Sequence, residues 1–127
     1  MLKQSISLVL LCFAGHTFAA DIVVNTTEDV VAADDKCSLR EAIEYINQGR
    51  PEAGFNGCGG KETTDTIYLQ SLTYNLNKEI LISKAVTLRT RYESNLNSNL
   101  LGKHNAVIKM TGTDRIFNID RRSEATD

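Results

Sequence analysis

The second half of the chain is a series of short β-rich runs with no helical periodicity between them. The runs are Thr66 to Leu69, Tyr74 to Leu76, Glu79 to Ile82, Ala85 to Arg89, Ala106 to Met110 and Ile116 to Ile119. Ile67, Val86 and Val107 occupy similar places in three of them, at separations of 19 and 21 residues. A recurrence near twenty residues is typical of a parallel β-helix, in which each coil of short strands hydrogen-bonds the next. Strand spacing also leaves open an antiparallel sandwich with hairpin turns.

One helix is predicted before these runs. The S-x-x-E spacing from Ser38 to Glu41 is that of a capping box, in which hydroxyl and carboxylate satisfy each other's backbone N–H groups. Four apolar residues at helical spacing form one stripe, namely Leu39, Ala42, Ile43 and Ile46. Gly49 and Pro51 end the helix. We expect a helix at about 38–48, too short to be stable unless the stripe is buried.

The first residues have the features of an export signal. Lys3 supplies the basic start, Ile6 to Ala14 form the apolar stretch, and Thr17-Phe18-Ala19 offers small residues at the cleavage positions. Cleavage after Ala19, with Ala20 as the alternative site, removes 19 of the 127 residues and leaves 108. A buried N-terminal helix is the competing interpretation. We therefore expect a secreted or cell-surface protein.

The cysteine count supports a disulfide. Removing the signal also removes Cys12 and leaves Cys37 and Cys58, for which pairing is the default in an oxidising compartment. Two thiols with the one remaining histidine, His104, do not assemble a four-ligand zinc site. The bridge would tie the glycine-rich loop 49–65 to the start of the helix, and we expect no metal or cofactor.

Charge and hydropathy exclude several classes of partner. The net charge is -2, and no apolar run reaches the length of a membrane-spanning helix. No block of like charges is long enough to form an acidic or basic tail. A role in binding nucleic acid or an anionic membrane therefore has no electrostatic support.

An acidic cluster precedes the helix and consists of Glu28, Asp29, Asp34 and Asp35. Calcium takes several oxygen ligands, but the spacing matches no EF-hand loop and the expected glycine is missing. We interpret the cluster as a solvated acidic loop, with Asp34 and Asp35 near the positive end of the helix. Arg40 has two structural partners open to it: Glu44 one turn on, or an acidic residue of this loop.

The start of the predicted helix belongs to a longer motif, which reads Cys37-Ser38-Leu39-Arg40-Glu41-Ala42-Ile43, followed by Asn47, Cys58 and Asp65-Thr66-Ile67. With this motif the chain resembles the CSLREA domain, the N-terminal module of many large bacterial surface and secreted proteins with right-handed β-helix bodies. The similarity runs from about Asp21 to Ile119 and includes the runs Ile80 to Leu88 and Arg115 to Ile119. The chain departs from the family after Val86-Thr87-Leu88, where a glycine is usual and Arg89 stands instead.

The resemblance implies a mainly β fold, the start of a right-handed parallel β-helix of the pectin-lyase-like type with one N-terminal capping helix. In this organisation residues 1–19 are the signal peptide, 20–65 the cap, 66–120 the first coils and 121–127 a polar tail. We expect the apolar stripe of the helix to act as a lid over the first coil, with Ile22 to Val24 as an initial strand. Because such arrays need a cap at both ends, we expect the solenoid to continue downstream and this chain to be truncated.

We therefore expect a non-enzymatic module that caps a secreted or cell-surface β-helix protein, serving adhesion or another surface interaction with a carbohydrate or protein ligand. The alternative is the non-catalytic beginning of a carbohydrate-active β-helix enzyme, a lyase or hydrolase. Carboxylate and arginine pairs that such chemistry would use are Asp114 with Arg115, and Asp120 with Arg121 and Arg122. Turn chemistry at Gly112-Thr113-Asp114 favours a structural role for these residues. A small self-contained binding domain is the third possibility.

Overall fold

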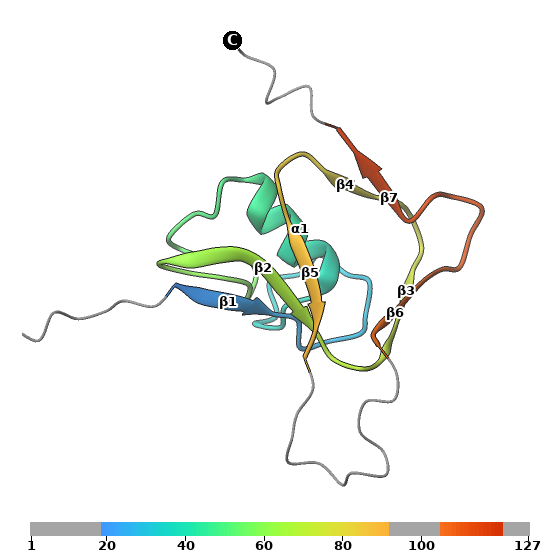
Figure 1. Cartoon of the computed structure of the whole chain (residues 1–127), viewed down its shortest axis with the longest axis horizontal. Coiled ribbons are helices and arrows are strands. Elements are labelled where there is room, and N and C mark those ends of the chain that lie inside the picture. Colours follow the sequence, from blue (N-terminus) through green and yellow to red (C-terminus); the bar gives the residue numbers. More distant parts are fainter. Residues whose placement is uncertain (1–18, 92–104, 121–127) are drawn as a thin grey trace, which may run out of the picture.

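The computed structural model describes residues 19–91 and 105–120. The expected signal segment up to residue 18, His104 and the polar tail 121–127 lie outside these ranges. Along the described chain the elements are β1 (Ala20–Val23), α1 (Leu39–Asn47), β2 (Thr63–Leu69), β3 (Thr73–Leu76), β4 (Ile80–Ile82), β5 (Thr87–Thr90), β6 (Val107–Met110) and β7 (Phe117–Ile119) (Figure 1). The fold is mainly β with one short helix, as the sequence indicates.

Every pair of strands in the described residues is parallel, and each strand from β2 to β4 pairs with the third strand after it. The pairs are β2 with β5, β3 with β6 and β4 with β7, while β1 pairs with the other edge of β2. We call β2, β3 and β4 the first triplet and β5, β6 and β7 the second triplet. Figure 1 shows the chain passing through the first triplet and returning beside β2 as β5. This pairing contradicts the antiparallel sandwich and is consistent with the start of a β-helix.

The expected recurrence near twenty residues is wrong in its particulars. Ile67 lies opposite Leu88 and not Val86, because β5 begins two residues later than the predicted run. Val107 lies opposite Thr73 and so belongs to a different sheet. The three residues therefore do not stack on one another, although the parallel pairing that their spacing predicts is present.

The connections differ in length between the two triplets. Residues 70–72 join β2 to β3, whereas residues 91–106 join β5 to β6 at the equivalent place. The longer connection leaves and returns at neighbouring points, since the backbone N–H of Ala106 donates to the Thr90 Oγ1 at 2.9 Å. Strand pairing across the triplets is thus kept while the spacing along the chain is not.

The core continues from the first triplet into the second. Alternate residues of the first triplet point inward and are buried: Ile67, Leu69, Tyr74, Leu76, Ile80 and Ile82. The apolar residues in register with them are only partly covered, among them Leu88, Ile108, Met110 and Phe117. Ile119, opposite Ile82, is 68% exposed. The second triplet therefore extends the apolar interior without closing it.

The loop between α1 and β2 is held against the helix. The expected disulfide joins Cys37, just before the helix, to Cys58 in this loop, and both residues are buried. Tyr45 is also buried, and its hydroxyl donates to the Gly60 carbonyl at 2.8 Å and lies 2.7 Å from the Thr63 Oγ1. Gly59, at a φ of +68°, lies so close to the Tyr45 ring that a Cβ there would overlap it. A backbone contact of this kind requires glycine.

Gly59→Ala should therefore destabilise the protein much more than Gly49→Ala. Gly49 also has a positive φ, of +85°, but nothing lies near its missing Cβ. The strained backbone costs both variants about 1 kcal/mol, and the overlap with Tyr45 adds about 2 kcal/mol to the first alone. Urea unfolding followed by circular dichroism measures the two losses, and equal values would show that the contact between ring and backbone is unimportant.

Candidate functional site

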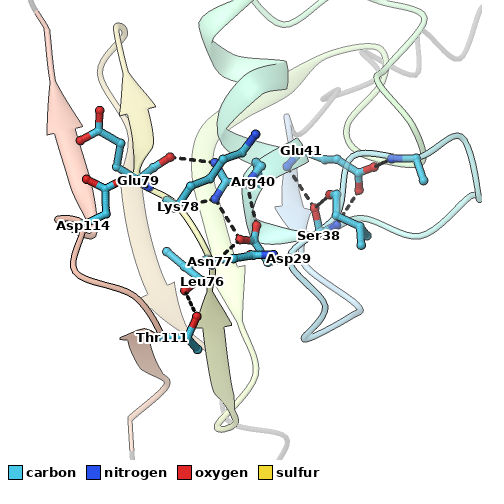
Figure 2. Close-up of polar contacts among 12 residues, drawn as sticks. Asp29, Ser38, Arg40, Glu41, Leu76, Asn77, Lys78, Glu79, Thr111 and Asp114 are labelled. Atoms are coloured by element: carbon cyan, nitrogen blue, oxygen red, sulfur yellow. Dashed lines mark hydrogen bonds and ion pairs between the residues drawn. The ribbon is translucent and has the colours of Figure 1, made fainter.

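The capping box at the start of α1 also holds the loop before it. The Ser38 Oγ accepts the Glu41 backbone N–H at 3.1 Å, and the Glu41 Oε2 accepts the Ser38 N–H at 2.9 Å. The second carboxylate oxygen of Glu41 accepts the Ala32 N–H at 2.8 Å, while the Ser38 hydroxyl donates to the Val30 carbonyl at 2.6 Å. Both side chains are fully buried, and Figure 2 shows their contacts with each other. This network fixes the loop that carries Asp29.

Arg40 pairs with Asp29 of that loop and not with Glu44. Two parallel hydrogen bonds join them, from Nε to Oδ1 at 2.6 Å and from Nη2 to Oδ2 at 2.9 Å. Their side chains are only 11% and 4% exposed. Of the two partners that the sequence left open, the structure has the acidic residue of the preceding loop. A two-bond pair of this type is stronger than a surface ion pair and fixes both side chains in one geometry.

The same two side chains reach the turn between β3 and β4. Arg40 donates from Nη1 to the Glu79 carbonyl at 2.8 Å and from Nη2 to the Lys78 carbonyl at 2.7 Å. Asp29 accepts the Asn77 backbone N–H at 2.9 Å through Oδ2. Figure 2 shows the guanidinium between the helix and this turn. The ion pair thus satisfies three backbone groups of the turn between β3 and β4.

Asn47, the last residue of α1, continues this row of contacts along β4. Its Nδ2 donates to the Leu81 carbonyl at 2.8 Å, and its Oδ1 accepts the Ser83 N–H at 3.0 Å. Ile82 between them uses its carbonyl on the opposite edge, where it accepts the Asp120 N–H at 2.9 Å. Backbone groups of 77–83 thus face Asp29, Arg40 and Asn47. The helix therefore covers the edge of the first triplet that faces away from the second triplet.

The stripe predicted to form the lid is buried as a unit. Leu39, Ala42, Ile43 and Ile46 are at most 3% exposed, and α1 contacts β2 and β4. Beside the helix, β1 covers the corresponding edge of β2, and the Val24 N–H extends that cover by donating to the Tyr68 carbonyl at 3.0 Å. Polar side chains, an apolar stripe and one strand together form the site.

Asp114 and Arg115, the first pair predicted as candidates for carbohydrate chemistry, both contact Glu79. The Asp114 Oδ2 accepts the Glu79 backbone N–H at 3.1 Å, on the opposite side of the turn from Arg40. Nearby, Thr111 donates through Oγ1 to the Leu76 carbonyl at 2.9 Å (Figure 2). Arg115 forms an exposed ion pair with Glu79 at 3.1 Å. Asp120 follows β7, while Arg121 and Arg122 lie outside the described residues.

Asp29 is set apart from the other acidic residues by its environment. Burial raises the pKa of its carboxyl, but hydrogen bonds from Arg40 and from the Asn77 N–H outweigh that effect and hold the pKa below its ordinary value. Asp34 accepts the Lys36 N–H at 3.0 Å in an exposed turn. In the part of the chain that the structure describes, no three His, Cys, Asp or Glu side chains are placed to bind a metal ion.

Two functional residues escaped sequence reasoning. Asp29 is one of four similar acidic residues in the sequence. It differs from the others in lying beside the turn at Asn77, which is close in space but 48 residues away along the chain. Asn47 belongs to the motif, but no local pattern indicates that its side chain binds a strand.

Residues 19–91 and 105–120 include no helix that is long and apolar enough to cross a membrane.

Comparison with family models, with curated proteins and with solved structures finds no match for this chain. The site is a backbone edge covered by side chains, beside a buried disulfide that suggests an oxidising, extracellular-type environment.

Asp29→Asn should lower stability at neutral pH and remove part of the acid sensitivity. The folded-state pKa of Asp29 lies below the unfolded one, so the unfolded chain binds more protons and stability falls as the pH drops from about 4 through the folded value. The variant leaves Arg40 nearly buried without its counter-charge, at a cost of about 3 kcal/mol at pH 7. Urea midpoints at pH 7, 4 and 2 measure both effects.

Glu28→Gln is the matched control, since Glu28 is an exposed carboxylate next to Asp29. It should leave the neutral-pH midpoint unchanged and keep the acid response of the wild type. An Asp29→Asn variant whose stability declines with acid as steeply as that of the control would contradict the role assigned to the ion pair.

Ile43→Asp should unfold the cap or cause aggregation, because Ile43 is 1% exposed at the centre of the buried stripe. Placing an unpaired carboxylate there costs about 4 kcal/mol or more. Gln48→Asp adds the same charge at an exposed position just after the helix and should cost only about 0.5 kcal/mol. Soluble yield and thermal unfolding are measured for both variants. Unchanged thermal stability of Ile43→Asp would show that the fold does not depend on burial of the stripe.

Proposed function

We propose that this chain is a non-enzymatic module that caps the N-terminal end of a right-handed parallel β-helix and forms its first coils. The cap consists of β1, α1 and the disulfide-tied loop, and the two triplets are the first two coils. Further coils, supplied by polypeptide continuing the same solenoid, stack on the second triplet. The module belongs to a secreted or cell-surface protein that serves adhesion or a related surface interaction.

The observation that carries this proposal is the difference between the two edges of the stack. On the side of the first triplet, β1 pairs with β2, while Asp29, Arg40 and Asn47 bind the backbone of 77–83. On the other side, β5, β6 and β7 each have a strand partner on one edge only among the described residues. A stack that is closed at one end and open at the other extends in one direction.

The open side also has the chemistry that a further coil requires. A mostly apolar hollow opens there between β4, β7 and the beginning of β5, lined by Ile82, Val86, Leu88, Phe117 and Ile119 together with Ser83, Lys84 and Ala85. Its apolar residues prolong the buried interior of the first triplet, and another coil in the same register would cover them as the second triplet covers the first.

The resemblance to the CSLREA type of module fits the same proposal, because residues of the shared motif make contacts in this structure. Cys37 forms the disulfide, Ser38 and Glu41 form the capping box, and Arg40 binds the first triplet. Leu39 and Ala42 are buried in the lid. Each of these six residues thus has a contact within the proposed cap, and export through the N-terminal signal would bring the cysteines to a compartment where they pair.

Self-association of the purified chain tests the open edge. Sedimentation velocity over a range of concentrations should show association, because unpaired strand edges with an apolar interior template pairing. Ile119→Lys places a charge at the open end of β7 and should weaken association on the order of tenfold, while stability is kept because Ile119 is 68% exposed.

Val31→Lys is the control, since Val31 is 55% exposed in the loop before α1, away from the second triplet. It should associate like the wild type. Equal association of Ile119→Lys and Val31→Lys, or a wild type that stays monomeric at every concentration, would overturn the proposal that the second triplet presents an edge for further coils.

A further inference from the structure

We propose that the Asn47 side chain acts as a one-residue β-strand: its amide takes the place of a backbone peptide group in a parallel ladder on β4, and thereby prevents a strand from adding to that edge. The inference deepens the proposed capping function, on which it rests for the meaning of the edge. It assigns to one side chain at the end of a helix the task that β1 performs for β2.

The hydrogen-bond pattern of Asn47 is that of a strand residue. In a parallel pair, a residue opposite position i donates its N–H to the carbonyl of i−1 and accepts the N–H of i+1. Asn47 donates from Nδ2 to the Leu81 carbonyl at 2.8 Å and accepts the Ser83 N–H through Oδ1 at 3.0 Å. With i at Ile82, both bonds have the strand pattern.

The genuine strand on the other edge of β4 shows the same geometry. There the Ile80 N–H donates to the Ile116 carbonyl at 2.9 Å and the Ile82 carbonyl accepts the Asp120 N–H at 2.9 Å, with Ile82 opposite Ile119. The short strand β4 is therefore bonded on both edges, by β7 on one side and by a primary amide on the other. An amide side chain is suited to this because its planar group holds an N–H donor and a carbonyl acceptor as a peptide group does, with a second N–H left over.

The end of α1 fixes Asn47 in the position where it binds β4. It is the last residue of α1, directly after Ile46 and Tyr45, which are buried and hold the end of the helix in place. Leu81, whose carbonyl is bound, has a side chain that is 48% exposed. Without the amide, the edge would offer a free carbonyl and a free N–H beside an exposed apolar side chain, which are the properties of an edge that accepts another strand.

Amide hydrogen exchange at Ser83 tests the proposal directly. In Asn47→Ala the Ser83 N–H loses its acceptor and should exchange on the order of tenfold faster than in the wild type, because one hydrogen bond is removed locally. The Asp120 N–H, bound to the Ile82 carbonyl on the other edge, should keep its protection. Gln48→Ala is the matched control, since the Gln48 side chain is exposed and donates to the Glu44 Oε1 at 3.4 Å on its own helix, so its loss should change neither amide.

A conservative variant separates the two halves of the ladder. Asn47→Asp keeps an oxygen that can accept the Ser83 N–H but has no donor for the Leu81 carbonyl, so it should retain Ser83 protection more fully than Asn47→Ala. If neither variant folds, the wild type supplies the measurement: one of the two Asn47 side-chain amide protons should exchange slowly and show a scalar coupling to the Leu81 carbonyl carbon.

Association provides the second readout. In the Ile119→Lys background, Asn47→Ala should restore concentration-dependent self-association, through strand addition at β4 by a second copy, and Gln48→Ala should not. Unchanged Ser83 exchange in Asn47→Ala, or no slow side-chain proton in the wild type, would overturn the strand role of Asn47. Those results are independent of whether Ile119→Lys affects association, so failure of this inference is distinguishable from failure of the proposed function.

Discussion

The first strands of a parallel stack have backbone N–H and C=O groups on an edge that no earlier coil can satisfy, and leaving those groups unpaired is costly. In this protein the edge is satisfied in two ways. A strand, β1, covers β2, and three polar side chains cover the backbone of 77–83. The disulfide, the capping box and the buried Tyr45 all hold the segments that bring those side chains to the edge.

Arginine suits its place in this arrangement because a nearly buried charge needs many partners. Arg40 has donors for two carboxylate oxygens and two carbonyls at once, in a fixed plane. A lysine has three donors around a single point and cannot span these acceptors. Glu41, which is also buried, likewise uses both of its carboxylate oxygens, which accept the N–H groups of Ala32 and Ser38. The charged residues of the motif are thus acceptors and donors for backbone groups.

Local patterns predicted the local structure well. The capping box and apolar stripe indicated the helix, the two cysteines indicated the disulfide, and the ends of the β-rich runs fall within three residues of the observed strands. The recurrence near twenty residues indicated β5 as the partner of β2 but gave the wrong register, and it grouped Val107 with them although β6 pairs with β3. Regular spacing fails as a guide here because the connections differ in length between the two triplets. Asp29 and Asn47 bind backbone 48 and 34 residues away, respectively. Contacts from a side chain to a distant peptide group leave no periodic pattern in a sequence.

The long connection between β5 and β6 has a consequence for how such a chain tolerates change. Residues 91–106 replace a link of three residues at the equivalent point of the first triplet, and β6 still finds its register on β3. The hydrogen bond from Ala106 to Thr90 holds the two ends of the connection together. This position is therefore a natural insertion point, where an epitope or a reporter peptide could be displayed on the flank of the stack without altering which strands meet.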